Sequence, residues 1–316
     1  MEIVKVGLCL DDKDFAEKLA EGLSREYKGL QIYLLDDLKG ISGLDLILAS
    51  RWNGQANVVV AGCDMQEEQL ESEPYRLCVY KDCPNMINDL LYIYFKLTGK
   101  NCRFVGENIC RTVAFCSASG SCEVTRTAVE TGKYLCRVFR SRCLYINLCF
   151  VDESHEIINH EDGSLLKLLY YVSNSVEFPV GRFISEGTEI DCLKTGVINS
   201  YSDEMTPELF EKLIVRIEEL GIYDFVLIDM GNQFSRTNRM LIEELDHTIL
   251  MEKDTRTQTA ETVRQELIRL RGEKPLMVLN CDKESYYGKH IAEISKKIVE
   301  DCEFEVIRQE LHTDKN

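Results

Sequence analysis

Short apolar segments alternate along the chain with segments whose apolar residues recur at helical spacing. Near the start, residues 2–10 (EIVKVGLCL) form the apolar run of a strand, and residues 13–27 place Phe15, Leu19 and Leu23 on one helical face. Such alternation joins parallel strands through helices, and the strands become buried on both faces. The sequence therefore predicts an α/β protein built on parallel sheets.

Two series of such elements follow one another. In the first, further strands are predicted at residues 30–35, 44–50, 57–62 and 76–80, with a closing helix at 86–97. In the second, strands are predicted at 112–116, 143–149, 223–229, 248–251 and 275–280, and helices at 122–139, 165–172, 207–220, 239–245, 257–270 and 290–301. Residues 99–109 lack a period and are predicted to be a linker. We therefore expect two domains, 1–98 and 110–316, which suits a length of 316 residues.

Acidic residues outnumber basic ones, 54 against 37, and the net charge is −17. Broad binding to nucleic acid or to an anionic membrane requires clustered Lys and Arg, so we expect neither. The charge is uneven: residues 101–150 hold seven basic and three acidic residues, whereas 151–250 hold seven and twenty. No apolar run reaches the roughly 18–20 residues of a membrane span, and the start of the chain does not resemble a signal peptide. We expect a cytoplasmic protein that contacts a membrane only through partners.

The fourteen cysteines are the unusual part of the composition. No pair has the spacing C-x-x-C, and no closely spaced pair has a matching pair downstream, so the pattern of a zinc site is missing. Several, such as Cys9, Cys78 and Cys149, lie inside apolar runs, where a thiol packs as a small hydrophobe. The pattern predicts reduced, structural thiols.

One segment joins a buried strand to a helix through a loop of small residues, TVAFCSASGSCEVTRTAVE at 112–130. The free N–H groups and the dipole at such a helix start favour an anion. The segment resembles the opening of the MinD/ParA-like ATPases, strand–S-x-x-G-G-x-G-K-T-T–helix, and Ser117, Gly120 and Thr125 agree with that pattern. An ordinary Ser/Gly turn is the alternative.

The segment also departs from that family where phosphate charge is neutralised. The two lysines of the pattern fall on Ser119 and Val124, and Glu123 places a carboxylate where backbone approaches phosphate in the family. Residues equivalent to the family's acidic pair after its second strand are Asn147 and Cys149. The resemblance therefore implies a P-loop fold with a degenerate phosphate site.

Later segments resemble the same family in the same order. Residues 223–229 (YDFVLID) look like the strand whose last aspartate, here Asp229, orients the magnesium shell. Residues 277–280 (MVLN) look like the strand that ends in the adenine-reading asparagine, here Asn280. If ATP and magnesium bind, the resemblance places the nucleotide on Gly120, Ser121, Thr125, Asp229 and Asn280, with magnesium at Thr125 and Asp229.

The first series of elements resembles a response-regulator receiver domain, which has a flavodoxin-like parallel sheet. Asp11 and Asp12 follow the first strand, where receivers bind magnesium, and Lys81 follows the fifth, where receivers carry a lysine. Ser50 stands at the position of the phospho-accepting aspartate, so the resemblance implies a receiver that forms no aspartyl phosphate. As alternatives, the aspartates cap the following helix and Lys81 is a surface lysine.

An atypical receiver fused to a MinD/ParA-like domain resembles the TadZ/CpaE pilus-assembly proteins. That resemblance implies a homodimer that positions pilus or secretion machinery, often at a cell pole. Without the lysines we expect a pseudo-ATPase with no catalytic residue, because phosphoryl transfer depends on neutralising cations. The alternatives are an active ATPase that uses another cation, such as Arg126, and a signalling adaptor. A basic stripe on the predicted helix is either such a contact or a solvated face: Arg126, Lys133, Arg137 and Arg140.

Overall fold

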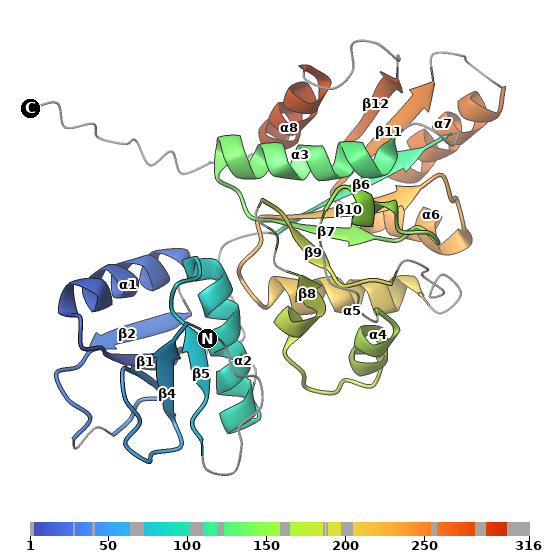
Figure 1. The fold of residues 1–316 in the computed structure, drawn as a ribbon. Helices are drawn as coiled ribbons and strands as arrows, with labels where there is room; N and C mark the ends of the chain where they lie inside the picture. Colours follow the sequence, from blue (N-terminus) through green and yellow to red (C-terminus); the bar gives the residue numbers. More distant parts are fainter. Residues whose placement is uncertain are drawn as a thin grey trace, which may run out of the picture. The chain divides into compact units, whose positions relative to one another are not determined.

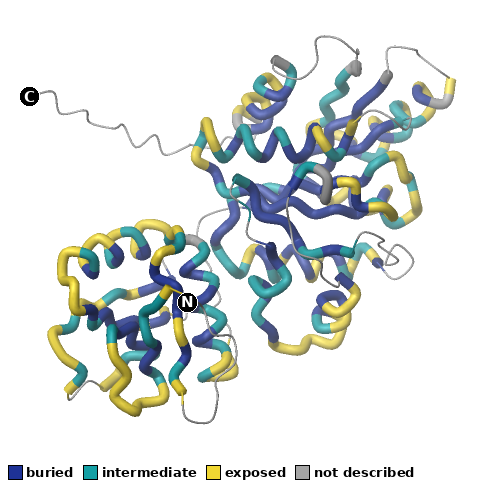
Figure 2. The backbone as a smooth tube through the Cα atoms, in the orientation of Figure 1, coloured by how far each residue is buried: buried dark blue, intermediate teal, exposed yellow. Residues whose placement is uncertain are grey.

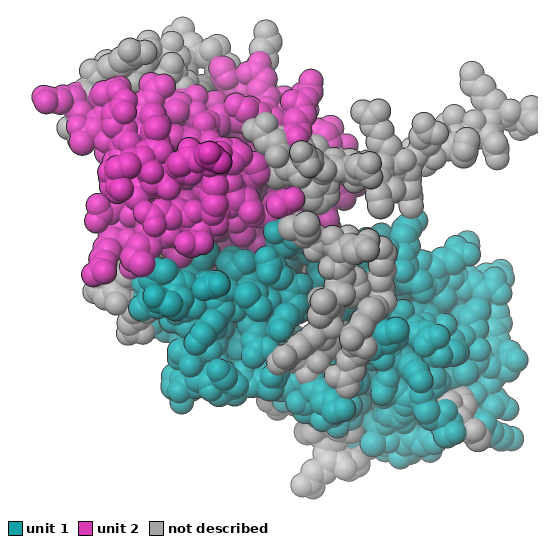
Figure 3. Space-filling view, turned by 180° about the vertical axis from the view of Figure 1, so that it is seen from behind, with its two compact units in different colours: residues 1–110, 161–186, 204–223 teal, residues 111–160, 187–203, 224–316 magenta. Residues whose placement is uncertain are grey.

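The computed structural model describes residues 3–27, 29–39, 42–63, 73–100, 110–118, 123–158, 165–185, 187, 189–196, 205–253, 258–281 and 289–301. The chain forms two compact units (Figure 3). Unit 1 comprises residues 1–110, 161–186 and 204–223, and unit 2 comprises 111–160, 187–203 and 224–316. Each unit thus combines segments that are far apart in the sequence. The domains at 1–98 and 110–316 stay a prediction.

Unit 1 contains a five-stranded parallel sheet (Figure 1). Its strands are β1 (Val4–Cys9), β2 (Leu30–Leu34), β3 (Leu46–Ala49), β4 (Val58–Gly62) and β5 (Arg76–Cys78). Their order is β2-β1-β3-β4-β5, and each neighbouring pair is parallel. This is the flavodoxin-like order of a doubly wound sheet.

The sheet of unit 1 is joined by helices whose first turns are capped. Helix α1 (Lys13–Glu26) begins after Asp12, whose side chain accepts a hydrogen bond from the Phe15 N–H, and Asp82 caps α2 (Cys83–Thr98) through the Asn85 N–H. Unit 1 also holds α4 (Leu165–Ser173), η2 (Val180–Phe183), β8 (Ile184–Ser185) and α5 (Pro207–Glu218).

Unit 2 is built on a larger parallel sheet with the order β12-β11-β6-β10-β7-β9. The strands are β6 (Arg111–Ser117), β7 (Cys143–Asn147), β9 (Asp191–Leu193), β10 (Phe225–Gly231), β11 (His247–Lys253) and β12 (Leu276–Cys281). The helices are α3 (Val124–Phe139), η1 (Glu153–Glu156), α6 (Arg236–Glu244), α7 (Gln258–Arg271) and α8 (Lys289–Asp301). Helix α3 contacts β6, β7 and β10 and packs beside α8 (Figure 1).

The central strands of unit 2 are buried along almost their whole length (Figure 2). Val113 and Phe115 of β6, Phe225 and Leu227 of β10 and Tyr145 of β7 are at most 1% exposed and face the same core. Strands buried on both faces read as continuous apolar runs. The predicted α/β class with parallel sheets is therefore confirmed.

Most predicted elements have counterparts in the structure, with small shifts at their ends. The structure also contains short elements that the sequence analysis did not identify: the four-residue helices η1 and η2, the two-residue β8 and the three-residue β9. Segments this short give no measurable period. None of the described helices combines the length and apolar character needed to cross a bilayer.

Candidate functional site

The carboxyl ends of β6, β10 and β7 meet at one edge of the larger sheet, because the three strands are parallel neighbours. In parallel α/β sheets, ligands bind at this edge. An open cleft of about 1140 Å³ lies here. Its lining residues are Ser117, Glu123, Val124, Thr125, Arg126, Glu130, Lys133, Cys149, Phe150, Val151, Glu153, Ile157, Gly231, Asn232 and Gln233.

Asp229 of β10 is the buried carboxylate beneath this cleft, with 0% of its surface exposed. Its Oδ2 accepts hydrogen bonds from Thr125 Oγ1 at 2.5 Å and from the Tyr145 hydroxyl at 3.0 Å. Its Oδ1 accepts from the Gly231 N–H at 2.9 Å and from Cys149 Sγ at 3.5 Å. A carboxylate has about four lone-pair sites, so donors of the chain itself occupy all of them. We call Asp229 and these four residues the carboxylate cluster.

Burial and hydrogen bonding act in opposite directions on the protonation of Asp229. Burial raises the pKa of Asp229, the hydrogen bonds from Thr125, Gly231, Tyr145 and Cys149 lower it, and the net shift is upward. Burial also raises the pKa of the Tyr145 hydroxyl and of the Cys149 thiol, and the negative charge of Asp229 adds to both effects. Both groups therefore keep their protons at neutral pH and serve as donors.

Gly231 gives the carboxylate cluster its shape. Its φ is +56°, and the register of β10 against β6 shifts between Asp229 and Gly231. A Cβ at this position would lie 2.8 Å from Cys149 Sγ. Glycine is needed both for the left-handed torsion and for the space, and its N–H then points back to the carboxylate.

The start of α3 forms another wall of the cleft. Glu123, its N-cap residue, has a left-handed backbone (φ 50°, ψ 41°) and makes no side-chain capping hydrogen bond. Two positions on, Thr125 directs its hydroxyl to Asp229 instead of leaving it free. The loop before Glu123, including the predicted nucleotide contacts Gly120 and Ser121, lies outside the described residues.

Basic residues of the α3 stripe are engaged by acidic ones. Lys133 Nζ lies 3.0 Å from Glu130 Oε1. Arg137 holds Glu189 through two hydrogen bonds of 2.6 and 2.7 Å. Among the described cations, Arg126 and Lys133 line the cleft, together with the acidic Glu123, Glu130 and Glu153. The lining therefore carries no net positive charge.

As arranged, the described residues do not fit a magnesium–triphosphate group. Thr125 and Asp229, the predicted magnesium contacts, do lie together, but their oxygens hydrogen-bond to one another, and Asp229 has no free lone pair. Glu123 and Glu130 line the space that a triphosphate would need. The carboxylates of Glu123 and Glu130 would repel the negative charge of a triphosphate in this space.

The other predicted nucleotide-site positions are placed as follows. Asn280 lies in β12, opposite Glu252 of β11, and its side chain is outside the described part of the structure. Asn147 ends β7, and its Oδ1 accepts the Cys149 N–H at 2.5 Å. The sequence analysis expected Cys149 only to pack as a small hydrophobe. In the structure it is also a hydrogen-bonded member of the carboxylate cluster.

Tyr145 is the site residue that the sequence analysis missed. It sits inside the buried run CLYINLC, where it counts only as an apolar residue of β7. A buried tyrosine needs a partner for its hydroxyl, however. Asp229 supplies that partner. The sequence signals that Tyr145 needs a partner, but only the order of the strands shows which group it is.

Each receiver-like residue of unit 1 has a described partner, and Asp11 and Ser50 contact one another. Asp12 caps α1, and the Asp11 N–H donates to Ser50 Oγ at 2.9 Å. The Asp11 carboxylate is exposed, with Arg51 Nη2 3.7 Å away. Lys81 instead pairs with the buried Asp89 of α2 at 2.9 Å.

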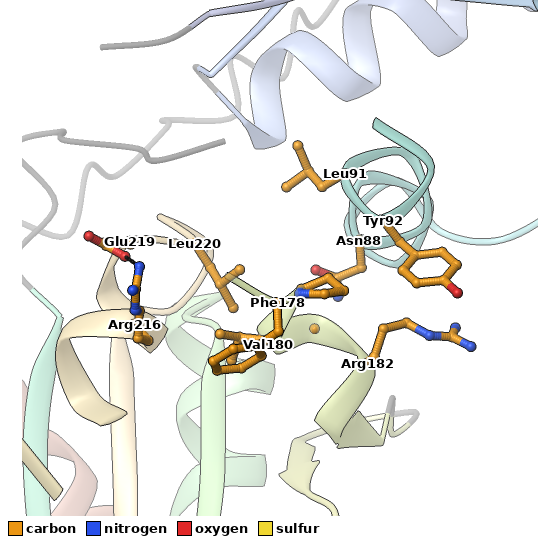
Figure 4. Close-up of a pocket in the computed structure, with 11 residues that line it drawn as sticks. Asn88, Leu91, Tyr92, Phe178, Val180, Arg182, Arg216, Glu219 and Leu220 are labelled. Atoms are coloured by element: carbon orange, nitrogen blue, oxygen red, sulfur yellow. Dashed lines mark hydrogen bonds and ion pairs between the residues drawn. The ribbon is translucent and has the colours of Figure 1, made fainter. Parts of the chain in front are cut away.

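A second cavity lies in unit 1, and it is too small for a nucleotide. It measures about 40 Å³ and lies where α2 meets η2 and the end of α5 (Figure 4). Arg182 lies over the Tyr92 ring at 4.3 Å from its centroid. Ligand pockets usually reach ~300–1,000 Å³, so a space of this size suits water.

No protein-family model and no curated protein sequence matches the chain. Among solved structures, it is similar to a ParA family ATPase from Chlorobium tepidum (16% identity, 60% of this chain and 81% of that chain, TM-score 0.46). It is also similar to cobyrinic acid a,c-diamide synthase from Mycobacterium smegmatis, solved with an ATP analog and magnesium (12%, 59% and 79%, TM-score 0.46). A third is the MinC:MinD cell division complex of Aquifex aeolicus (16%, 54% and 68%, TM-score 0.42). All three TM-scores are below 0.5. We therefore infer the chemistry of the site from its own geometry and not from these structures.

Proposed function

We propose that the chain is a scaffold protein that positions pilus or secretion machinery through protein contacts, and that its cleft does not hydrolyse ATP. It is a MinD/ParA-like protein with an atypical receiver domain, similar in arrangement to the TadZ/CpaE proteins. It acts as a homodimer in the cytoplasm, at a pole or at a membrane that it reaches through its partners.

The arrangement around Asp229 is the observation that most supports the loss of hydrolysis. Phosphoryl transfer needs positioned cations and a metal that neutralises the developing charge. The carboxylate cluster instead uses the polar groups of the edge to satisfy one another. A site built this way stabilises the fold of the sheet edge without a ligand.

Exposed apolar side chains beside the cleft support a role in protein contacts. Phe150 and Val151 follow β7, line the cleft and remain 47% and 49% exposed. Large apolar side chains at the centre of a contact surface contribute much of the affinity between proteins. A partner subunit would cover both at once.

Calorimetric titration with ATP, with and without magnesium, tests the absence of hydrolysis. We expect no binding heat at millimolar ATP and no phosphate release above the protein-free rate. Arg126→Ala and Lys133→Ala, which change only cleft-lining cations, are expected to give the same null result. Micromolar binding, or hydrolysis that Arg126→Ala removes, would contradict the proposal.

The competing function is an active ATPase with an unusual cation. One observation favours it: Thr125 and Asp229 remain adjacent, and Arg126 lines the same cleft. This alternative predicts that magnesium and ATP together break the Thr125–Asp229 hydrogen bond. It therefore predicts a nucleotide-dependent change in amide exchange at the start of α3, which the scaffold proposal does not.

Deletion of the gene in its native host tests the scaffold role. We expect fewer surface pili or less secretion, and full rescue by Arg126→Ala. A paired change of the exposed apolar residues, Phe150→Ser with Val151→Ser, is expected to fold but to fail in rescue. Normal piliation and secretion after deletion would rule out this role.

A further inference from the structure

Strand β2 is an edge strand of the sheet in unit 1 (Figure 1). On one side it pairs with β1 in a parallel ladder that runs from Val4 opposite Leu30 to Leu8 opposite Leu34. No strand among the described residues pairs with its other side. An open edge of this kind presents a row of N–H and carbonyl groups to which another strand can bind.

The alternation of the backbone shows which groups of β2 face the open side. The Gly29 carbonyl accepts a hydrogen bond from β1 at 3.0 Å, and the Leu35 N–H donates one to β1 at 2.9 Å. Backbone groups point to alternate sides along a strand, so the odd-numbered residues of β2 bond to β1. The N–H and carbonyl groups of Ile32 and Leu34 therefore face the open side.

β2 lacks the features that usually keep an edge strand from pairing. Its sequence, LQIYL, contains no charged residue and no proline. The opposite edge strand, β5, has only three residues and begins with the exposed Arg76. On β2, the side chains of Tyr33 and Leu34 are 37% and 53% exposed. The two edges of the sheet therefore differ, and β2 is the one suited to pairing.

We propose that β2 binds antiparallel to β2 of a second copy of this chain, so that two unit 1 sheets join into one. A two-fold axis beside Ile32 makes the contact self-complementary. The Ile32 N–H of each copy donates to the Ile32 carbonyl of the other, and the Leu34 N–H of each donates to the Leu30 carbonyl of the other. The Leu30 N–H is not needed, because it already donates to the Tyr27 carbonyl.

Charge favours a second copy as the occupant of this edge. The exposed Asp36 and Asp37 follow β2, and Asp36 contacts Lys13 at 3.1 Å. Before β2, Arg25 lies in the last turn of α1 and keeps 67% of its side chain exposed beside Glu26. In the antiparallel pair, the acidic end of each β2 approaches the end of the other that carries Arg25. Opposite charges therefore approach on both sides of the two-fold axis.

This inference rests on the homodimer of the proposed function and assigns its contact to unit 1. A pair of five-residue strands is smaller than the interfaces of about 1,200–2,000 Å² that hold stable complexes. We therefore expect a dimer that dissociates on dilution, with a dissociation constant on the order of micromolar.

Sedimentation of the full-length chain from about 1 to about 100 µM tests this contact. Leu34→Lys places a charge on the open edge, and Ile32→Pro removes an N–H that bonds only in the dimer. We expect each variant to raise the dissociation constant at least about tenfold. Tyr80→Lys is the matched control, because Tyr80 is 75% exposed, follows β5 at the opposite edge and should leave the dimer unchanged.

Amide hydrogen exchange of the wild type gives a second readout that needs no variant. The N–H groups of Ile32 and Leu34 should exchange more slowly at about 100 µM than at about 1 µM, because the dimer protects them. The N–H groups of Gln31 and Tyr33 bond to β1 and should exchange at the same rate at both concentrations.

The possible results separate this inference from the homodimer itself. A wild-type dimer that Leu34→Lys and Ile32→Pro leave intact would overturn the inference, and the homodimer would then form elsewhere. A wild-type chain that stays monomeric at about 100 µM would overturn both and leave the edge to a strand of another protein. If the variants lose the native circular dichroism spectrum, exchange of Ile32 and Leu34 that is independent of concentration would overturn the inference.

Discussion

The two sheets end in opposite ways at the edge where parallel α/β proteins bind ligands. In unit 1, the residues Asp11, Asp12, Ser50 and Lys81 follow strands at such an edge. Asp11 and Ser50 contact one another, whereas Asp12 and Lys81 have partners on other elements. In unit 2, one carboxylate, Asp229, is fully buried and gathers four donors. The carboxyl edge of the sheet therefore carries several small sets of contacts in unit 1 and a single connected cluster in unit 2.

This contrast teaches how a sheet edge can remain stable without a bound ligand. Exposed carboxylates such as Asp11 satisfy themselves with water, so losing a metal costs them little. A buried carboxylate cannot contact water, so it needs hydrogen-bond donors from within the chain. We therefore expect substitutions in unit 2 to cost far more free energy than equivalent ones in unit 1.

The largest effect is expected for Asp229→Ala. The hydroxyls of Thr125 and Tyr145 and the Gly231 N–H would lose their acceptor in a buried site, and each unsatisfied group costs about 1–3 kcal/mol. We expect the free energy of unfolding to fall by about 3 kcal/mol or more in urea denaturation. A loss below about 1 kcal/mol would mean that the cluster does not hold the edge together.

A smaller loss is expected for Tyr145→Phe, which removes one hydroxyl and keeps the ring. A hydrogen bond to a charged acceptor contributes about 1.5–3 kcal/mol, so the free energy of unfolding should fall by about 2 kcal/mol. Tyr80→Phe is the control, because that ring is 75% exposed. Equal effects of the two substitutions would remove the contrast between buried and exposed sites.

The protonation of Asp229 should affect how the free energy of unfolding depends on pH. Its folded pKa is raised above the ordinary value of 3.8, chiefly by burial, so between the two values the folded state binds more protons than the unfolded state. Stability from this group is therefore present at low pH and lost as pH rises through the folded pKa, by at most about 1.4 kcal/mol per pH unit. The asparagine of the Asp229→Asn variant does not titrate. As pH rises from about 4, the free energy of unfolding of the wild type should therefore fall relative to that of the variant. The prediction is wrong if the free energy of unfolding of the wild type stays constant or rises relative to that of the variant over this range.

In unit 1, Asp12→Ala should cost about 1 kcal/mol. It removes the side-chain acceptor of the Phe15 N–H at the start of α1, and the loss of an N-cap has this typical magnitude. Asp12→Asn is expected to retain most of the stability because asparagine also caps. The same loss in both variants would point to a role for the charge instead.

The smallest effect is expected for Ser50→Ala. The only described hydrogen bond of the Ser50 side chain accepts the exposed Asp11 N–H, which water can replace. The free energy of unfolding should change by no more than about 0.5 kcal/mol. A loss as large as that of Tyr145→Phe would show that the edge of unit 1 is also a connected cluster.

Sequence periodicity predicted the parallel sheets because a strand such as Phe225–Gly231 is apolar for almost its whole length. The resemblance of residues 223–229 to the MinD/ParA-like strand is what identified Asp229. Periodicity did not predict that Tyr145 would reach Asp229, because strand order decides which residues are neighbours and order is not visible in a period.

Asp12 shows how far local signals reach. Its capping of α1 depends only on residues three apart in the chain, and the sequence analysis named it as an alternative to metal binding. Lys81 shows the limit, because its pairing with Asp89 depends on how α2 returns along the sheet. Contacts within one turn were predictable, whereas those between elements needed the fold.

Gly231 has a consequence for natural variation. Its torsion disfavours any larger side chain, and its distance from Cys149 leaves no room for one unless position 149 also becomes smaller. Its N–H is useful only while position 229 accepts it. Positions 145, 149, 229 and 231 should therefore change together among related sequences, even where the loop before α3 varies freely. A related chain that regained the lysines would be expected to lose the tyrosine first.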